Sequence, residues 1–161
     1  GTKTDVAVVS SALQLDAAAL IDGLADSVDA WPSLDTIGGI AATGSYAFTS
    51  TMDLTTVATR NFIAKIAALS FDTADLVDAR TTDVDYWDDV DGDAVNDCDV
   101  TAYIRTTPDD PAGTPTWSDW RPWRVGDFNC RAAQFRLDFA SGSRNHNIAV
   151  STLEVRARTP V

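Results

Sequence analysis

Two segments of this 161-residue chain alternate between apolar and other side chains, and this alternation constrains the fold more than any other feature of the sequence. The alternating positions are Cys98, Val100, Ala102 and Ile104 against Asp99, Thr101, Tyr103 and Arg105, and Ala133, Phe135, Leu137 and Phe139 against Ala132, Gln134, Arg136 and Asp138. Successive side chains of a strand point to opposite faces, so each segment predicts a strand with one buried face.

Other segments also favour strands. Residues 5–15 begin with β-branched residues and predict a first strand. Tyr46, Phe48, Met52 and Leu54 share one face of an alternating stretch. Residues 60–70 are apolar on both faces except for Lys65, which predicts a central strand, with a short helix as the competing interpretation of this Ala-rich segment.

The last alternating segment changes phase. Ile148 and Val150 face one way, whereas Leu153 and Val155 face the other, which predicts a β-bulge near residues 151–152.

Together these segments predict an all-β fold, a single β-sandwich domain over residues 1–161. The one helix we expect is short, near residues 16–23, with Asp16 as its N-cap and Gly23 near its end. Of the 24 acidic residues, all but Glu154 are aspartates. Aspartate favours turns, whereas glutamate favours helices. This bias agrees with strands and loops.

Charge and motif content narrow the function. The formal net charge of −12 argues against nucleic acid or an anionic membrane as partner, and no apolar run is long enough for membrane insertion. The sequence has no recognisable catalytic motif, and His146, the only histidine, lies in a polar turn, so we expect no enzyme activity. Because the chain begins at Gly1, we expect it to be a piece of a longer protein.

Cys98 and Cys130 each lie in a predicted strand. Two reduced thiols or one cross-strand disulfide both fit this placement.

An acidic run extends from Asp72 to Asp99 and contains Arg80 as its one basic residue. Within it, Asp89, Asp91, Asp93 and Asp97 are spaced as oxygen ligands around calcium would be. Ala94 and Val100 replace the turn glycine and the closing carboxylate of an EF-hand, which excludes the complete motif. An irregular calcium site and a solvated acidic loop remain the two interpretations.

A tryptophan-rich loop follows the strand that ends near residue 105. Its candidate saccharide-binding residues are Trp117, Asp119, Trp120, Arg121 and Trp123. Exposed rings flanked by charged groups suit stacking on a sugar. However, a spacing of three cannot place all three rings on one face of an extended chain, so the alternative is that at least two rings close the end of the sandwich.

Residues 103–124, YIRTTPDDPAGTPTWSDWRPWR, resemble a repeated signature of the central tail-tip proteins, also called host-specificity or tip attachment proteins, of long-tailed phages and gene transfer agents. Further matching segments are Gly126-Asp127-Phe128, Arg131 with Gln134-Phe135-Arg136, Gly44-Ser45-Tyr46-Ala47-Phe48 and Met52-Asp53-Leu54. Thr55 stands where that family usually has glycine, so we expect the turn there to differ.

The resemblance implies a galactose-binding-like jelly roll, a type of β-sandwich that often binds glycans, sometimes beside a structural calcium. It implies a non-enzymatic role in host-surface attachment or tail-tip assembly, with other tail-tip subunits as partners and a host-surface saccharide as a candidate ligand. The expected location is the tail tip of the virion, assembled in the bacterial cytoplasm, with a homotrimer formed through the parent protein. A carbohydrate-binding module of a secreted bacterial glycosidase is the alternative.

Overall fold

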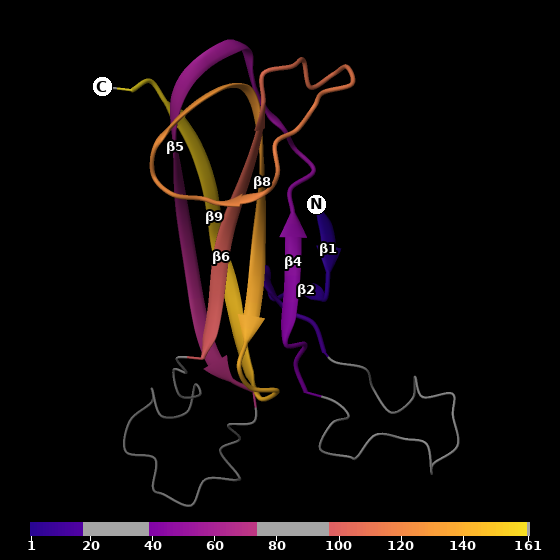
Figure 1. Ribbon diagram of the computed structural model, residues 1–161. Helices are drawn as coiled ribbons and strands as arrows, with labels where there is room; N and C mark the ends of the chain where they lie inside the picture. The colour runs from indigo at the N-terminus through magenta and orange to yellow at the C-terminus, as the bar shows by residue number, and fades with distance from the viewer. Residues whose placement is uncertain (18–38, 74–96, 161) are drawn as a thin grey trace, which may run out of the picture.

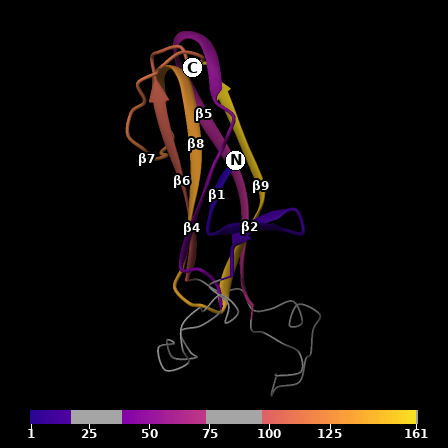
Figure 2. The same ribbon diagram turned by 90° about the vertical axis from the view of Figure 1, so that its right-hand side faces the viewer.

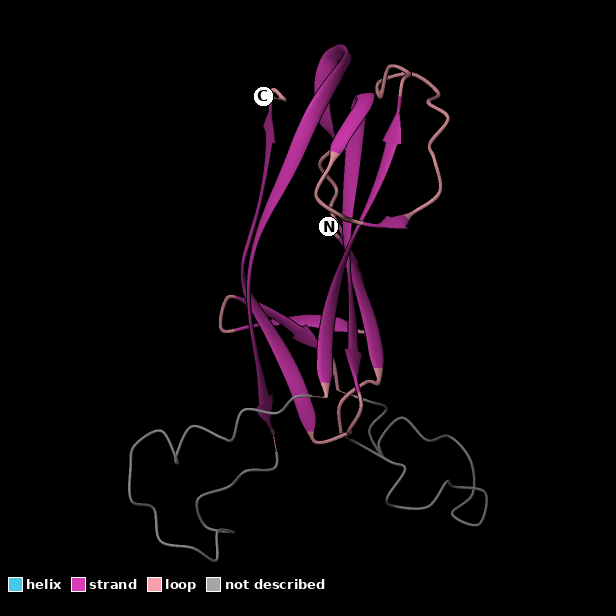
Figure 3. Ribbon diagram, turned by 60° about the vertical axis from the view of Figure 1, so that its left-hand side comes forward, coloured by secondary structure: helices cyan, strands magenta, loops and turns pink. Residues whose placement is uncertain are grey.

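The computed structural model describes residues 1–17, 39–73 and 97–160, and all regular secondary structure in these ranges is β (Figures 1 and 3). The strands are β1 (Thr2–Thr4), β2 (Val6–Val9), β3 (Ala12–Leu15), β4 (Thr43–Ala47), β5 (Met52–Asp72), β6 (Cys98–Thr107), β7 (Arg121–Pro122), β8 (Asp127–Ser141) and β9 (His146–Arg158). The described ranges accordingly contain no helix that could span a membrane.

The strands pair antiparallel in the order β1-β4-β8-β5-β9-β3-β2, and β6 pairs with the other edge of β8 and with β7. Two long strands close this sheet into a β-sandwich, as predicted (Figure 2). β5 pairs through residues 52–61 with β8 and through residues 61–72 with β9, so it passes from one layer into the other. β8 is contacted along its other edge by β6 over ten registered residue pairs.

The core consists of two apolar clusters. One joins the two layers through Leu137 and Phe139 of β8, Ile148 and Val150 of β9, and the hairpin residues Val6 and Leu15. The other is centred on Phe62, Ile104 and Phe135, of which Phe62 and Ile104 are fully buried. The inward residues predicted for β6 and β8 contribute to these clusters, which confirms the alternation of both segments except at Ala132, which was predicted on the outer face and is buried like Ala133.

The phase change in the last strand is also confirmed. Thr152 pairs with Ala67 and Val150 pairs with Ala68, which leaves Ser151 as the extra residue of a bulge. This bulge reverses which positions of β9 face the core.

Two strand predictions need correction. Residues 5–15 form two strands, because Ser10 and Ser11 adopt positive φ angles of 48° and 69° and turn the chain into a β2–β3 hairpin. Residues 60–70 form a strand and not a helix, but the strand is not covered on both faces, since Ile63 and Leu69 remain 37% and 64% exposed. Most of the predicted helix, residues 18–23, lies outside the described residues.

Gly44 allows the N-terminal segment to approach β4. A Cβ atom there would lie 2.6 Å from the backbone oxygen of Asp5 and 2.9 Å from side-chain atoms of Val6 and Leu15. A larger residue would therefore separate β4 from the corner between β1 and β2. This approach brings Asp5 to the rim of the groove described next.

Candidate functional site

The outer face of β4, β8 and β6 carries mostly polar side chains. Because Phe135, Leu137 and Phe139 of β8 point into the core, Gln134, Arg136 and Asp138, which alternate with them, point outward. The register aligns these residues with outward residues of both neighbours, in the rows Ser45–Asp138–Thr101, Ala47–Arg136–Tyr103 and Thr43–Ala140–Asp99. The folding of three separate chain segments thus creates one polar surface.

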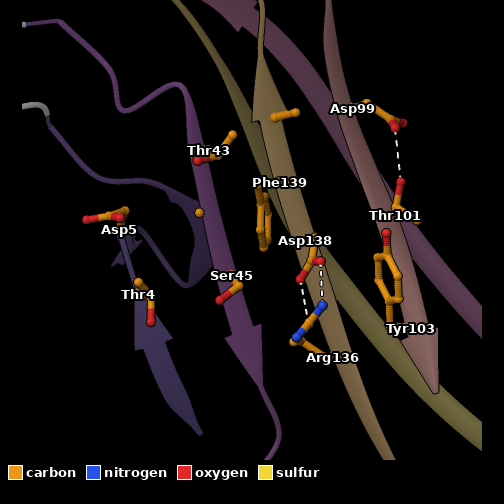
Figure 4. Close-up of a pocket in the computed structure, with 12 residues that line it drawn as sticks. Thr4, Asp5, Thr43, Ser45, Asp99, Thr101, Tyr103, Arg136, Asp138 and Phe139 are labelled. Atoms are coloured by element: carbon orange, nitrogen blue, oxygen red, sulfur yellow. Dashed lines mark hydrogen bonds and ion pairs between the residues drawn. The ribbon is translucent and has the colours of Figure 1, made fainter. Parts of the chain in front are cut away.

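This surface is hollowed into a groove of about 470 Å³. Its polar lining combines hydroxyl groups, carboxylates and a guanidinium, contributed by Thr4, Asp5, Thr43, Ser45, Asp99, Thr101, Tyr103, Arg136 and Asp138, and Gly44, Phe139 and Ala140 complete the lining. Figure 4 shows these side chains over β4, β8 and β6, with Thr4 and Asp5 on the wall formed by the N-terminal segment.

An ion pair lies on the floor of the groove. The Nη2 atom of Arg136 donates to Oδ2 of Asp138 at 2.8 Å, and its Nε atom lies 2.7 Å from Oδ1 (Figure 4). The two side chains retain 27% and 32% exposure, so that both are accessible to a ligand. Asp99 accepts a hydrogen bond from Oγ1 of Thr101 at 3.1 Å, which fixes the carboxylate at the rim.

The tryptophan-rich segment runs beside β6 and is held by backbone hydrogen bonds. The Ser118 amide donates to the Thr106 carbonyl at 3.0 Å, and the Thr106 amide donates to Oγ of Ser118 at 3.0 Å. Further along, the Trp123 amide donates to the Ala102 carbonyl at 2.7 Å. The loop that leaves β6 therefore returns along the edge of that strand.

Two tryptophan rings cover arginines on the outer face. The Arg105 guanidinium lies 5.2 Å from the centre of the Trp117 ring and 4.7 Å from that of Trp120. Arg136 lies 5.0 Å from the Trp120 ring and 5.0 Å from the Tyr103 ring. Rings and guanidinium groups thus alternate in one stack, and Arg136 belongs both to this stack and to the groove.

The stack has an electrostatic cost. Burial, followed by repulsion from Arg136, lowers the pKa of Arg105. The Oε1 atom of Gln134 offsets this, since it accepts from Nε of Arg105 at 2.8 Å and from Nη2 at 2.6 Å. The tryptophan rings contribute a further attraction through their electron-rich faces.

The remaining predicted saccharide residues lie elsewhere. Trp123 points into the sandwich, where its ring centre lies 4.9 Å from that of Phe135, so the three tryptophans do not share one face, as the spacing predicts. Arg121 lies over the Phe128 ring at 4.8 Å, and Asp119 is exposed. Neither of these two charged residues lines the groove.

The first half of the loop is anchored to a bulge in β5. Arg131 lies 2.8 Å from Oδ2 of Asp110 and 3.6 Å from Oδ1 of Asp53. The Ala112 amide donates to Asp110 at 3.0 Å and, with a smaller contribution from Arg131, lowers the pKa of that carboxyl. A further bond, from the Thr116 amide to Asp109 at 2.8 Å, closes the loop.

Sequence reasoning missed the groove residues Tyr103, Arg136, Asp138, Asp99 and Thr101. They were identified only as the outward positions of two strands. The signal that could have found them is the pairing of those strands, because Tyr103 opposite Arg136 and Thr101 opposite Asp138 place the polar sets side by side.

The calcium prediction falls largely outside the described residues, which exclude Asp89, Asp91 and Asp93. Asp97 is described, and its Oδ1 atom lies 2.6 Å from Nδ1 of His146. Within the described ranges, no three His, Cys, Asp or Glu side chains are grouped as a metal site would require.

Both cysteines are free thiols. Cys98 pairs with Ser141 at one end of β8, whereas Cys130 lies eleven positions earlier on that strand. At roughly 3.3 Å per residue they are tens of ångströms apart along the strand, far beyond the ~7 Å that a disulfide spans. Burial raises the pKa of both thiols.

No protein-family model, curated protein sequence or solved structure matches this chain.

Proposed function

We propose that this β-sandwich is a non-enzymatic recognition domain of a phage-type tail-tip protein, and that its groove binds a host-surface saccharide. The observation that carries the proposal is the groove on the outer face of β4, β8 and β6, lined by hydroxyl groups, carboxylates and Tyr103 beside the stacked tryptophans. An exposed sheet face with this composition serves no purpose in core packing.

The lining suits the chemistry of a sugar. Vicinal hydroxyl groups donate to carboxylates and exchange hydrogen bonds with side-chain hydroxyls, which Asp138, Thr101 and Ser45 supply in one row across three strands. An aromatic ring packs against the apolar face of a pyranose, and Tyr103 is available for this in the next row. The volume of about 470 Å³ lies within the range of small-molecule sites.

The tail-tip part of the proposal rests on the resemblance of residues 103–124. The segment that carries it forms the second half of β6 and the loop over the arginine stack, and it contributes Tyr103 to the groove. The partners are then the other tail-tip subunits, the parent protein supplies any trimer contacts, and the domain belongs to the virion. A carbohydrate-binding module of a secreted glycosidase would use the same groove, and a catalytic domain in the parent gene would identify it.

Binding of the purified chain to a glycan array tests the proposal. We expect binding to a defined set of saccharides that is lost in Thr101→Val, which removes one groove hydroxyl while keeping the shape of the side chain. The matched control is Thr59→Val on β5, an exposed position outside the groove. An array that stays silent for the parent chain overturns the saccharide proposal.

Trp120→Ala locates the ligand relative to the tryptophan stack. If the ligand lies in the groove, we expect a reduction in affinity that is smaller than that of Thr101→Val, because Trp120 reaches the groove only through Arg136. Complete loss in Trp120→Ala with normal binding by Thr101→Val would place the saccharide on the loop instead.

A further inference from the structure

The charges of the groove set which saccharides it can accept. Its lining contains the carboxylates of Asp5, Asp99 and Asp138 against one guanidinium, that of Arg136. Arg136 is paired with both oxygens of Asp138, so its strongest ion-pair interaction is already made within the protein. The remaining two carboxylates belong to opposite sides of the groove, since Asp5 lies in the N-terminal segment and Asp99 in β6 (Figure 4).

We infer that the groove selects neutral saccharides and rejects anionic ones such as uronic or sialic acids, with Asp99 and the Arg136–Asp138 pair as the determinants of this selectivity. The inference rests on the proposed function and adds the class of saccharide to it.

Among the described residues that line this groove, an anionic sugar finds no cation apart from the paired Arg136. To bind Arg136 it would have to displace Asp138, which would leave that half-buried carboxylate without its partner. A neutral sugar leaves the pair intact, and its hydroxyls donate to the carboxylate oxygens. The same geometry therefore favours one class and disfavours the other.

The size of the discrimination follows from the two uncompensated carboxylates. In water, two like charges about 5 Å apart repel by enough to weaken binding about fourfold. Because Asp5 and Asp99 both line the groove, an added carboxylate that lies about 5 Å from each of them should weaken binding by more than about tenfold at low salt. The formal net charge of −12 on the chain acts in the same direction over longer range.

The experiment compares matched pairs of glycans that differ only in one carboxyl group, using the full chain. The probes are galactose against galacturonate oligomers and lactose against sialyl-lactose, measured on the array and by calorimetry at 50 mM and 500 mM NaCl. At 50 mM NaCl we expect the neutral member to bind more than about tenfold more tightly than the acidic one, and we expect a smaller difference in affinity at 500 mM, because salt screens exposed charges.

Two variants test the determinants. Asp99→Asn should reduce the ratio of the affinities for the neutral and the acidic glycan about fourfold, since it removes one repelling charge without changing the shape of the side chain. Asp138→Asn should narrow it further, because it frees the Arg136 guanidinium. Asp127→Asn is the control, as it removes the same charge at the first residue of β8, far from the groove.

The outcomes separate this inference from the proposed function. Preference for the acidic members, or an unchanged ratio in Asp99→Asn, overturns the selectivity while leaving saccharide binding in place. Absence of binding to every probe, neutral and acidic, overturns both. Asp99 is exposed, so its variant remains informative even if Asp138→Asn does not fold.

Discussion

Replacing Arg105 by methionine tests whether the arginine–aromatic stack holds the tryptophan-rich loop on the sheet. Methionine keeps much of the length and apolar surface of the side chain but removes the guanidinium. The variant loses two ring contacts, to Trp117 and Trp120, and both hydrogen bonds to Gln134. It also leaves the Gln134 oxygen without these donors.

The magnitude can be worked from these contacts. Each cation–π contact at a partly exposed site contributes about 0.5–1 kcal/mol, and hydrogen bonds from a charged group contribute about 1.5–3 kcal/mol. Part of this loss in stability is offset, because the variant no longer buries a charge and no longer places one beside Arg136. These are the two effects that lower the pKa of Arg105. We expect a net loss of about 2 kcal/mol in the free energy of unfolding.

Urea unfolding followed by circular dichroism measures this loss. With a slope of about 2 kcal/mol per molar urea, the midpoint should fall by about 1 M in Arg105→Met. Arg124→Met is the matched control, since Arg124 is exposed and should change stability by less than about 0.5 kcal/mol. A double-mutant cycle with Trp117→Ala should give a coupling energy of about 0.5–1 kcal/mol. An unchanged midpoint in Arg105→Met, or a coupling energy of zero, would refute the structural role of the stack.

Three further predictions concern other parts of the chain. Thr55 has a φ of 65°, a conformation that disfavours β-branched residues, so Thr55→Asn should raise the free energy of unfolding by about 0.5–1 kcal/mol in urea titrations, and a decrease would show that the strain is absent. Because Cys130 is 1% exposed and Cys98 is half-buried, a thiol reagent should label Cys98 first and both only after unfolding, whereas a disulfide would leave none to label. The pKa of Asp110 is lowered in the folded state, so its contribution to stability is present above the ordinary aspartate pKa and is lost as pH falls through the folded value. Asp110→Asn should therefore make the free energy of unfolding fall less steeply at acid pH, and an unchanged acid dependence would contradict this.

The strands that could be predicted are those with a single alternating period. Phe135, Leu137 and Phe139 repeat at every second position, and the structure buries all three. The bulge at Ser151 was predictable for the same reason, since an extra residue must shift the phase of the pattern. The hairpin at residues 6–15 was missed because its turn uses two serines in the left-handed region, where sequence signals usually come from glycine or asparagine.

The groove could not be predicted from the sequence for a different reason. The alternation that buries Leu137 also determines that Arg136 and Asp138 share an outer face, so their chemistry was already present in the pattern. What the pattern leaves open is the neighbour on each side and the register, and a shift of one residue would place Ala102 instead of Tyr103 beside Arg136. Tertiary pairing also decides the role of the tryptophans, because the loop returns along β6 and directs Trp120 onto Arg136 while Trp123 enters the core. The lining of the groove therefore depends on strand order more than on any local motif, which is why the conspicuous tryptophans lie beside the groove and are not among its lining residues.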